Sequence, residues 1–515
     1  MFGHGMTMSD VLARTARRSP DAVVFVFDDQ RRSYREADLR VTGLARALAD
    51  LGVGRGDRVA VLGKNRGEVI ETWLATLRLG AIAVPLNFRL VADEIAYMLG
   101  DSEAKVIVVD EDLAATVETA KQLAGSNAPT ISYGSEYERI VSRPTGEPLP
   151  ELEPSDLDPA YIMYTSGTTG RPKGAVLTHR NLMVHAFSAI TTVGNTSSFK
   201  VWMSAAPLFH VAGVSGSASA LMVGGTIVIP RSGSFDPRST LKKMADEKVT
   251  SCFMVPSQWA AVCNVPDLGS FDLSSLRRAS WGAAPATTTL LRTMIEKFPT
   301  AEVSSAFGQT ECSPVTCLLR GEDSIRKLGS VGKPIRNVEI RVVDEDMVDV
   351  KRGEVGEIVY RSPMVMKEYW RKPDETAEAF RGGWFHSGDL VRQDEEGYVY
   401  VVDRKKDMII SGGENIYCAE VENVLATHPK VSEVALIGVP DEKWGEVPMA
   451  LVVPLAPADP PTFAEIESFS RERLAGFKRP KHLVVIAEMP RNPSGKVLKT
   501  QLRQQYATIG STTRD

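Results

Sequence analysis

The sequence predicts an α/β protein with a large N-terminal domain and a small α+β C-terminal domain. The large domain is expected to hold layered, mostly parallel sheets with helices, plus a β-rich subdomain. Short β-branched segments alternate with segments of helical apolar spacing, which is typical of parallel sheets covered by helices. A β-rich pattern with turns follows at 338–402, and a new strand–helix pattern begins after a charged cluster at 403–406.

The alternation begins at Asp57. Strands are expected at 57–63, 81–86 and 105–110, because these segments are short and rich in Val and Ile. Between them, apolar residues recur at helical spacing over 68–79 and 92–99. Further strands are expected at 226–229, 250–255, 338–344, 356–363 and 397–403.

The pattern in the last part of the chain predicts a separate unit. Helices are expected near 419–428 and 463–474, and strands at 431–439, 448–455 and 482–487. We therefore predict an N-terminal domain at 1–402, a hinge at 403–406 and a C-terminal domain at 407–515.

Composition excludes several classes of protein. The 515 residues contain 43% hydrophobic and 24% charged residues, as expected for a soluble globular chain rather than a disordered one. The net charge of −5 argues against nucleic acid as a partner. Five scattered cysteines include no C-x-x-C pair, so neither a disulfide framework nor a structural zinc site is expected. From this use of cysteine we expect a reducing, cytoplasmic location.

No membrane-spanning segment is expected. The N-terminus lacks the basic and apolar regions of a secretory signal. The charge-free stretch 201–230 is interrupted by proline, histidine and glycines, so we interpret it as chain buried in a large core. Peripheral membrane contact and a homodimer remain open.

Basic residues are concentrated near the C-terminus. Between Arg471 and Arg503 there are nine basic residues and two acidic ones. This excess is consistent with a small polyanionic ligand, although a solvated face would have the same composition.

The strongest motif is the segment 164–174, Tyr-Thr-Ser-Gly-Thr-Thr-Gly-Arg-Pro-Lys-Gly, between a strand-like segment and a helical segment that begins near Asn181. Small hydroxyl and glycine residues make a loop whose N–H groups can surround phosphate oxygens, and Lys173 adds positive charge. A plain linker would not require Arg171 and Lys173 beside the glycines. The loop does not match the Walker A pattern.

This loop resembles the phosphate-binding signature of the adenylate-forming superfamily, which includes acyl-CoA and aryl-CoA synthetases. Six more segments resemble that family in the same order and extend the resemblance over essentially the whole chain. They are APLFHVAG at 206–213, GAAP at 282–285, FGQTE at 307–311, FHSGDL at 385–390, DRKKDMIISGGENIY at 403–417 and PRNPSGKVLK at 490–499.

The resemblance implies a nucleotide site and a magnesium site. Glu311 and Thr165 would hold Mg²⁺ near the phosphates of ATP, and Phe307 would offer an aromatic face to adenine. Asp389 would accept the ribose hydroxyls, with Arg404 beside it. The remaining nucleotide-binding positions are Ser166, Gly167, Thr168, Thr169, Gly170, Lys173, Ala283, Ala284, Gly308 and Thr310. In isolation, an FGQTE segment would more often be a helix cap.

Four residues are expected to act in catalysis by the same resemblance: Lys496, His210, Glu311 and Lys173. Lys496 resembles a mobile lysine that bridges the substrate carboxylate and the α-phosphate, where positive charge stabilises the anionic transition state. His210 resembles a gate between the acid pocket and the thiol entry, whereas a lone histidine in an apolar segment is usually a core residue.

Coenzyme A is expected at the C-terminal domain. Gly412 and Gly413 match the loop along the pantetheine channel, where close backbone approach requires residues without Cβ. Lys443 and Trp444 resemble a coenzyme A contact. Lys406 matches the pivot on which this mobile domain would turn.

The implied activity is that of an AMP-forming acyl-CoA synthetase that uses ATP, Mg²⁺ and coenzyme A. A fatty acid is the favoured substrate, with arylpropenoic or ring-containing acids as alternatives. The acid pocket would be lined by Trp202, 207–218, 281–284, 307–308 and 314–315. The rival interpretations are an enzyme that adenylates an acid and loads a carrier protein, an oxidative relative such as a luciferase, and a catalytically silent binding protein.

Overall fold

The computed structural model describes residues 6–142, 149, 155–165, 171–282, 286–321, 323–491 and 497–506. Packing divides the chain into two compact units. Unit 1 comprises Met1–Ile340 and Tyr360–Phe385, and unit 2 comprises Arg341–Val359 and His386–Asp515. The predicted hinge at 403–406 concerns a motion and stays a prediction.

The first 142 residues form the alternating pattern expected from the sequence. The elements are α1 (Met8–Arg18), β1 (Val23–Phe27), β2 (Gln30–Ser33), α2 (Tyr34–Asp50), β3 (Arg58–Leu62), α3 (Gly67–Arg78), β4 (Ile82–Pro85), α4 (Ala92–Ser102), β5 (Val106–Val109), α5 (Ala114–Ala124), β6 (Thr130–Ser132) and α6 (Ser135–Val141). Capping boxes begin α1 at Thr7 and α2 at Ser33, where each hydroxyl accepts a hydrogen bond from a backbone N–H of the first turn.

The smaller sheet of unit 1 has the strand order β18-β8-β7-β4-β3-β5-β6. The strands from β6 to β7 (Pro159–Thr165) in this order pair in parallel, and β8 (Lys173–Thr178) and β18 (Glu368–Tyr369) continue the sheet in antiparallel fashion. Strand β8 is not predicted from the sequence, where only a loop at 164–174 and a helical segment near Asn181 are expected.

The remaining helices and strands of unit 1 are α7 (His179–Val193), η2 (Thr196–Phe199), β9 (Val201–Ser204), α8 (Val211–Met222), β10 (Thr226–Ile229), α9 (Pro237–Asp246), β11 (Ser251–Met254), α10 (Pro256–Cys263), β12 (Arg278–Gly282), α11 (Thr288–Lys297), β13 (Glu302–Gly308), η4 (Thr310–Cys312), β14 (Val315–Leu319), α12 (Asp323–Arg326), β15 (Ser330–Pro334) and α13 (Pro373–Ala379). Most of the charge-free stretch 201–230 is buried in β9, α8 and β10, in agreement with the core interpretation.

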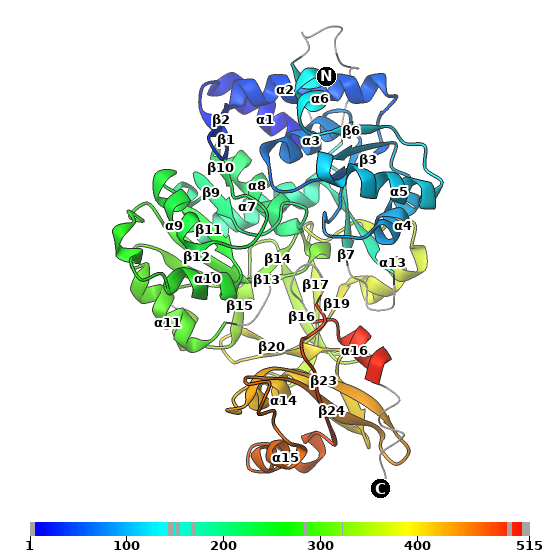
Figure 1. Ribbon diagram of the computed structural model, residues 1–515, viewed down its shortest axis with the longest axis vertical. Coiled ribbons are helices and arrows are strands. Elements are labelled where there is room, and N and C mark those ends of the chain that lie inside the picture. Colours follow the sequence, from blue (N-terminus) through cyan, green and yellow to red (C-terminus); the bar gives the residue numbers. More distant parts are fainter. Residues whose placement is uncertain are drawn as a thin grey trace. The chain divides into compact units, whose positions relative to one another are not determined.

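The larger sheet of unit 1 has the strand order β15-β14-β13-β12-β11-β9-β10-β1-β2. The strands from β13 to β1 in this order pair in parallel. Helices α9, α10 and α11 lie along one side of β11 and β12 (Figure 1). Buried residues of that side, among them Met254, Trp259, Trp281 and Met294, form a continuous hydrophobic cluster. On the opposite face of the sheet, α8 packs on β9 and β10, and Trp202 of β9 contacts Gly216 of α8.

Unit 2 contains an antiparallel β part and the α+β part expected from the sequence. Strands β16 (Glu339–Val343), β17 (Val355–Arg361), β19 (Phe385–Gln393) and β20 (Val399–Arg404) are neighbours in that order. A second sheet has the order β22-β21-β24-β23, and β25 pairs with β24. Its elements, with the helices, are β21 (Ile409–Ser411), β22 (Glu414–Ile416), α14 (Cys418–Leu425), β23 (Val431–Asp441), β24 (Gly445–Pro454), α15 (Phe463–Arg471), β25 (His482–Val485) and α16 (Lys499–Tyr506).

The structure therefore confirms the predicted α/β class, with large sheets in one part and a smaller α+β part. Among the described residues, no helix combines the length and the apolar character that crossing a membrane requires.

Candidate active site

The two ends of the phosphate-loop motif lie side by side in unit 1. Thr165 ends β7 and Lys173 begins β8, and the two residues are direct partners in the antiparallel ladder. The Thr165 hydroxyl donates to the Lys173 carbonyl at 3.4 Å. The intervening Ser166, Gly167, Thr168, Thr169 and Gly170 lie outside the described residues. A short strand pair thus holds the predicted magnesium ligand Thr165 and the predicted phosphate-binding residue Lys173 at the two ends of the loop.

Tyr369 connects two predicted site residues, Glu311 and Lys173. Its hydroxyl donates to Glu311 Oε1 at 2.9 Å, and Lys173 Nζ lies 5.2 Å from the centroid of its ring. Strand β18 places Tyr369 here because it pairs with β8. Burial and the neighbouring Glu311 carboxylate raise the pKa of Tyr369, so its hydroxyl keeps its proton. The structure thus brings Glu311 and Lys173 together around a tyrosine that the sequence analysis missed.

The FGQTE segment is held by a close backbone turn. Gly308 has a φ of 151°, and a Cβ there would lie 1.9 Å from the Pro314 carbonyl oxygen. The Gln309 N–H donates to that same oxygen at 3.0 Å. Only glycine fits this approach, which fixes Phe307 at the end of β13 and Thr310 at the start of η4. Ala283 and Ala284, the expected neighbours in the nucleotide site, lie outside the described residues.

His210 lies directly before α8 in an aromatic environment. Its ring centroid is 4.5 Å from that of Phe209, which packs edge-on against Phe88. Nε2 of His210 is buried and has no hydrogen-bond partner among the described residues. Burial, and secondarily the charge of Arg89, lower the pKa of His210 to about 4, so the imidazole is neutral near pH 7. The gate at His210 stays a prediction.

In unit 2, Asp389 and Arg404 are paired as the sequence analysis expects. They are opposite each other on β19 and β20, and Arg404 Nε lies 2.5 Å from Asp389 Oδ1. Glu357, which the sequence analysis missed, supports this pair: its carboxylate accepts from the Gly388 N–H at 3.0 Å and from Lys405 Nζ at 3.3 Å. The buried Asp389 carboxylate is therefore fixed by its own strand pair.

The predicted coenzyme A residues also meet in unit 2. Gly412 has a φ of 60°, and a Cβ there would lie 2.5 Å from Trp444 Cε3. The Gly412 N–H donates to the Trp444 carbonyl at 2.8 Å, and Lys443 Nζ lies 4.6 Å from the centroid of the Trp444 ring. Gly413 also has a positive φ, and no atom lies near its absent Cβ. An aromatic ring, a lysine and two glycines thus form one small surface.

The predicted pivot, Lys406, is exposed in the turn after β20. Asp407, its neighbour, donates its N–H to the Arg404 carbonyl at 2.9 Å and accepts from Arg503 of α16 at 3.0 Å. Lys496, the predicted catalytic lysine, lies outside the described residues.

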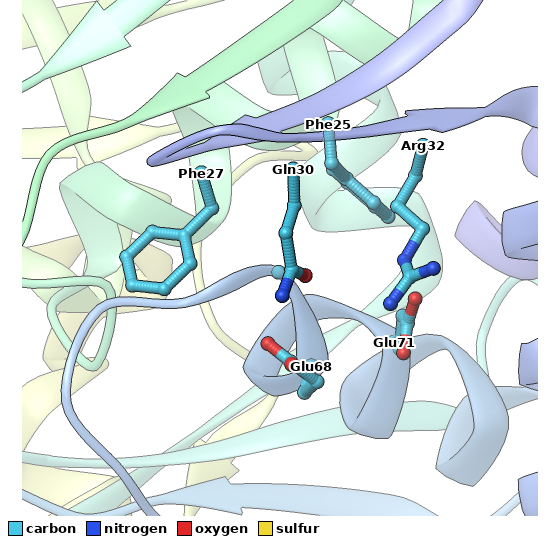
Figure 2. Close-up of a pocket in the computed structure, with 7 residues that line it drawn as sticks. Phe25, Phe27, Gln30, Arg32, Glu68 and Glu71 are labelled. Atoms are coloured by element: carbon cyan, nitrogen blue, oxygen red, sulfur yellow. The ribbon is translucent and has the colours of Figure 1, made fainter. Parts of the chain in front are cut away.

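A small pocket elsewhere in unit 1 contains none of the predicted site residues. It lies between the β1–β2 hairpin and α3, where Phe25, Gln30 and Arg32 face Glu68 and Glu71 (Figure 2). No group of three or more His, Cys, Asp or Glu residues suited to a metal occurs there or elsewhere in the described part of the chain.

The acidic side of that pocket is neutralised from within the protein. Arg40 Nε donates to Glu71 at 2.8 Å, and both of its Nη groups donate to Glu138 at 2.7 and 2.8 Å. Tyr137 also donates to Glu71, at 3.0 Å. We therefore interpret this region as a structural ion network.

Comparison with known proteins agrees with the family resemblance. The family model of the AMP-binding enzymes matches residues 12–370, and the model of their C-terminal domain matches residues 420–496. A feruloyl-CoA synthase of Amycolatopsis is 40% identical over 96% of this chain and 98% of its own length. A long-chain-fatty-acid–CoA ligase of Mycobacterium tuberculosis is 37% identical, with the same coverage of both chains.

The structure also resembles that of an O-succinylbenzoate coenzyme A synthetase of Bacillus subtilis, solved with ATP and a magnesium ion. The TM-score is 0.85 at 32% identity, over 96% of this chain and 99% of that one. Together with the matched family models, these likenesses show that the chain belongs to the AMP-binding enzyme family and is an AMP-forming acid–CoA ligase.

Proposed function

We propose that this ligase activates an acid with an apolar body, a fatty acid in the first instance, and transfers it to coenzyme A. The observation that supports the assigned residues best is the Glu311–Tyr369–Lys173 cluster. It combines a carboxylate, a lysine and a protonated hydroxyl next to the two ends of the phosphate loop.

ATP is the first substrate of this reaction. Lys173 and the loop 166–170 surround its phosphates, Phe307 and the segment 283–284 bound its adenine, and Asp389 with Arg404 binds its ribose. Gly308 and Thr310 complete the adenine side. For Asp389, the supporting observation is its burial on a rigid strand pair, which holds an acceptor of two hydroxyl groups in one position.

The donor set also suits Mg²⁺, which prefers few protein ligands and completes its shell with water and substrate phosphates. The Glu311 carboxylate and the Thr165 hydroxyl are hard oxygen donors of this kind. Tyr369 donates to Oε1 of Glu311, which orients the carboxylate. When bound, the ion supplies positive charge to the phosphate oxygens.

In the first half-reaction, a carboxylate oxygen of the acid attacks the α-phosphorus of ATP, and pyrophosphate leaves. Both reactants are anions, so cationic side chains lower the barrier. Lys173 supplies one such charge at the phosphates, and Lys496 supplies a second between carboxylate and α-phosphate. The product is an acyl-adenylate.

In the second half-reaction, the thiol of coenzyme A attacks the acyl carbonyl, and AMP leaves. Trp444 and Lys443 contact the coenzyme, while Gly412 and Gly413 allow the pantetheine arm to pass close to the backbone. His210 controls entry to the acyl carbonyl. Its imidazole is neutral and apolar in its surroundings, so an uncharged ring borders the proposed path of the thiol.

Two classes of acid fit the chain. The fatty-acid–CoA ligase relative favours a fatty acid, and the feruloyl-CoA synthase relative favours an arylpropenoic acid. Trp202 and Phe253 support an apolar body of either kind, because they lie on one face of the larger sheet, on β9 and β11. Trp281, which was expected to line the acid pocket, instead lies on the opposite face of the sheet, in the cluster under α9–α11. We therefore leave Trp281 out of the proposed pocket.

The test is to incubate the purified protein with ATP, Mg²⁺ and a panel of acids, with and without coenzyme A. Pyrophosphate release and mass spectrometry then follow both half-reactions. We expect acyl-CoA and AMP as final products with fatty or arylpropenoic acids. Acyl-AMP that accumulates despite coenzyme A would indicate an enzyme that loads a carrier protein. No pyrophosphate with any acid would contradict the proposal.

A further inference from the structure

Arg278 is a buried arginine without a carboxylate partner. It begins β12 and is 9% exposed. Its Nε donates to the Ser304 hydroxyl at 3.1 Å, and its guanidinium lies 5.8 Å from the centroid of the Phe199 ring. Within the described residues these are its side-chain contacts, and no acidic group forms an ion pair with it. The nearest acidic neighbour in the sheet is Glu302, whose carboxylate instead binds Arg320 at 2.9 Å.

This arrangement differs from that of Arg40, the other buried arginine of the described chain. Arg40 is bound by two carboxylates, whereas Arg278 has one neutral hydroxyl. Burying a charge is costly unless it is paired and hydrogen-bonded. The two Nη groups of Arg278 therefore remain available to an external anion, which they can bind in bidentate geometry.

The sheet face that carries Arg278 leads toward the expected nucleotide site. Alternation along β12 places Arg278, Ser280 and Gly282 on one face, and their β13 partners include Ser304 and Ala306. Along β12 and β13 these side chains are small over the stretch from Gly282 to Arg278, a distance of about 13 Å at strand spacing, and Phe253 of β11 borders it beside Gly282. Gly282 adjoins the segment 283–285, so this face of β12 leads from the expected nucleotide site to Arg278.

A second unsatisfied donor supports this assignment. His185 of α7 is 3% exposed, and its Nε2 accepts the Val315 N–H at 3.3 Å. Burial, and then the positive charge of Arg278, lower the pKa of His185 to about 3. The neutral ring therefore carries its hydrogen on Nδ1, which is buried and unpartnered in the described structure. The Nη groups of Arg278 and Nδ1 of His185 are thus donors for which the described residues provide no acceptor.

We propose that Arg278 binds a second carboxylate at the distal end of the acid, so that the preferred substrate is a dicarboxylic acid. The inference rests on the proposed function and deepens it. One carboxylate is activated at ATP, the apolar body lies along the small residues of β12 and β13, and Arg278 binds the other carboxylate. Trp202 and Arg278 both pair with Ser251, from opposite sides of β11, and therefore lie at the same position along the strands. Trp202 would thus provide an apolar surface beside the distal carboxylate.

The experiment compares α,ω-dicarboxylic acids, from pimelic to sebacic acid, each with the monocarboxylic acid of equal length. We expect kcat/KM for the best dicarboxylic acid to exceed that of its partner about tenfold or more, as for a hydrogen bond between charged groups. Arg278→Met should remove this preference by lowering the dicarboxylic value, with monocarboxylic values changed less than about threefold. Arg277→Met is the matched control, because Arg277 is the exposed neighbour and its hydrogen bonds within the described residues go to backbone carbonyls.

The outcomes separate this inference from the proposed function. Pyrophosphate release with both acid classes at equal kcat/KM in the unaltered protein would overturn the role of Arg278 and leave the ligase activity intact. An equal loss for both classes in a folded Arg278→Met variant would also overturn it. If that variant does not fold, Arg278→Lys retains the charge and should keep part of the preference. Absence of pyrophosphate with every acid would instead contradict the proposed function.

Discussion

The two units contain small clusters that differ in their chemistry. In unit 1, Glu311, Tyr369 and Lys173 form a cluster of charged groups held by a charged hydrogen bond and a cation–π contact. In unit 2, Gly412 and Trp444 are joined by a backbone hydrogen bond, and the Trp444 ring approaches closely because Gly412 has no side chain. The first suits phosphoryl chemistry, where charge must be stabilised, and the second suits the passage of a slender thiol arm.

This difference indicates how each cluster should fail. Removing a charge from unit 1 should impair adenylation, because electrostatic stabilisation is lost. Adding atoms to the surface of unit 2 should impair thioester formation, because space is lost. Measuring both half-reactions for each variant therefore tests the comparison.

The largest effect is expected for Glu311→Ala. Loss of the Mg²⁺ ligand should lower overall activity by about 10²-fold or more. Pyrophosphate release measures the effect, and thermal unfolding should stay close to that of the parent protein. Glu345→Ala, at an exposed acidic position, is the control. A Glu311→Ala variant with near-normal turnover would show that the FGQTE assignment is wrong.

Lys496→Ala should affect one half-reaction selectively. Acyl-AMP formation should fall by about 10²-fold or more, because a cation at the reacting anions is lost. Thioester formation from supplied acyl-AMP and coenzyme A should be largely spared. Lys481→Ala, at an exposed position within the same basic stretch of the sequence, is the control. Equal damage to both half-reactions would assign Lys496 a structural role or a role in both.

Lys406→Pro tests the predicted pivot. Proline fixes φ near −65° and restricts the preceding residue, so a backbone change at this turn is blocked. We expect adenylation to survive to a useful degree and thioester formation to fall far more. The measurement is the rate of each half-reaction. Acyl-CoA formation at the parental rate would exclude a pivot at Lys406 and the domain boundary with it.

Gly412→Ala tests the surface that Gly412 and Trp444 form in unit 2. The new methyl group would meet the Trp444 ring, and the positive φ is costly for alanine, by about 1–2 kcal/mol. Thioester formation should fall about tenfold while adenylation changes little. Gly397→Ala controls for backbone strain alone, because Gly397 also has a positive φ but no backbone or aromatic neighbour within 4 Å of an added Cβ. If the two variants behave alike, the contact with Trp444 has no role.

The smallest effect is expected for Tyr369→Phe. The ring beneath Lys173 remains, and only the hydrogen bond to Glu311 is lost. Hydrogen bonds to charged groups contribute about 1.5 kcal/mol, which corresponds to about a tenfold loss in kcat/KM for ATP. Restoration by raised Mg²⁺ would support a role in orienting the metal ligand. An unchanged kcat/KM at limiting Mg²⁺ would contradict that role.

Much of the fold could be predicted from the sequence because local patterns determine it. The apolar spacing in α3 and the β-branched run of β10 predict each element closely. Strand β8 was missed because Lys173–Thr178 is short and directly follows a glycine-rich loop, so its identity depends on pairing with β7. Local pattern contains no information about such pairing.

The site was predictable where motifs are contiguous and not where the fold brings distant residues together. The Asp389–Arg404 pair and the Gly412–Trp444 contact join residues that the sequence analysis had named. Tyr369 was missed because its partner Glu311 is 58 positions away. Arg278 was missed because an arginine at the start of a strand is usually exposed to solvent. Its burial depends on the position of β12 as an inner strand of the sheet, which the local sequence does not specify.

The exposure of Trp444 provides an optical probe. Trp444 is 46% exposed, whereas the tryptophans at positions 73, 202, 259 and 281 are buried and those at 370 and 384 are half-buried. Acrylamide should therefore quench Trp444 first and leave the buried indoles emitting. Because its ring lies against Gly412 and Lys443, a ligand that covers this surface should shield it from the quencher. The accessible fraction of the fluorescence would then report occupancy of unit 2 without any label.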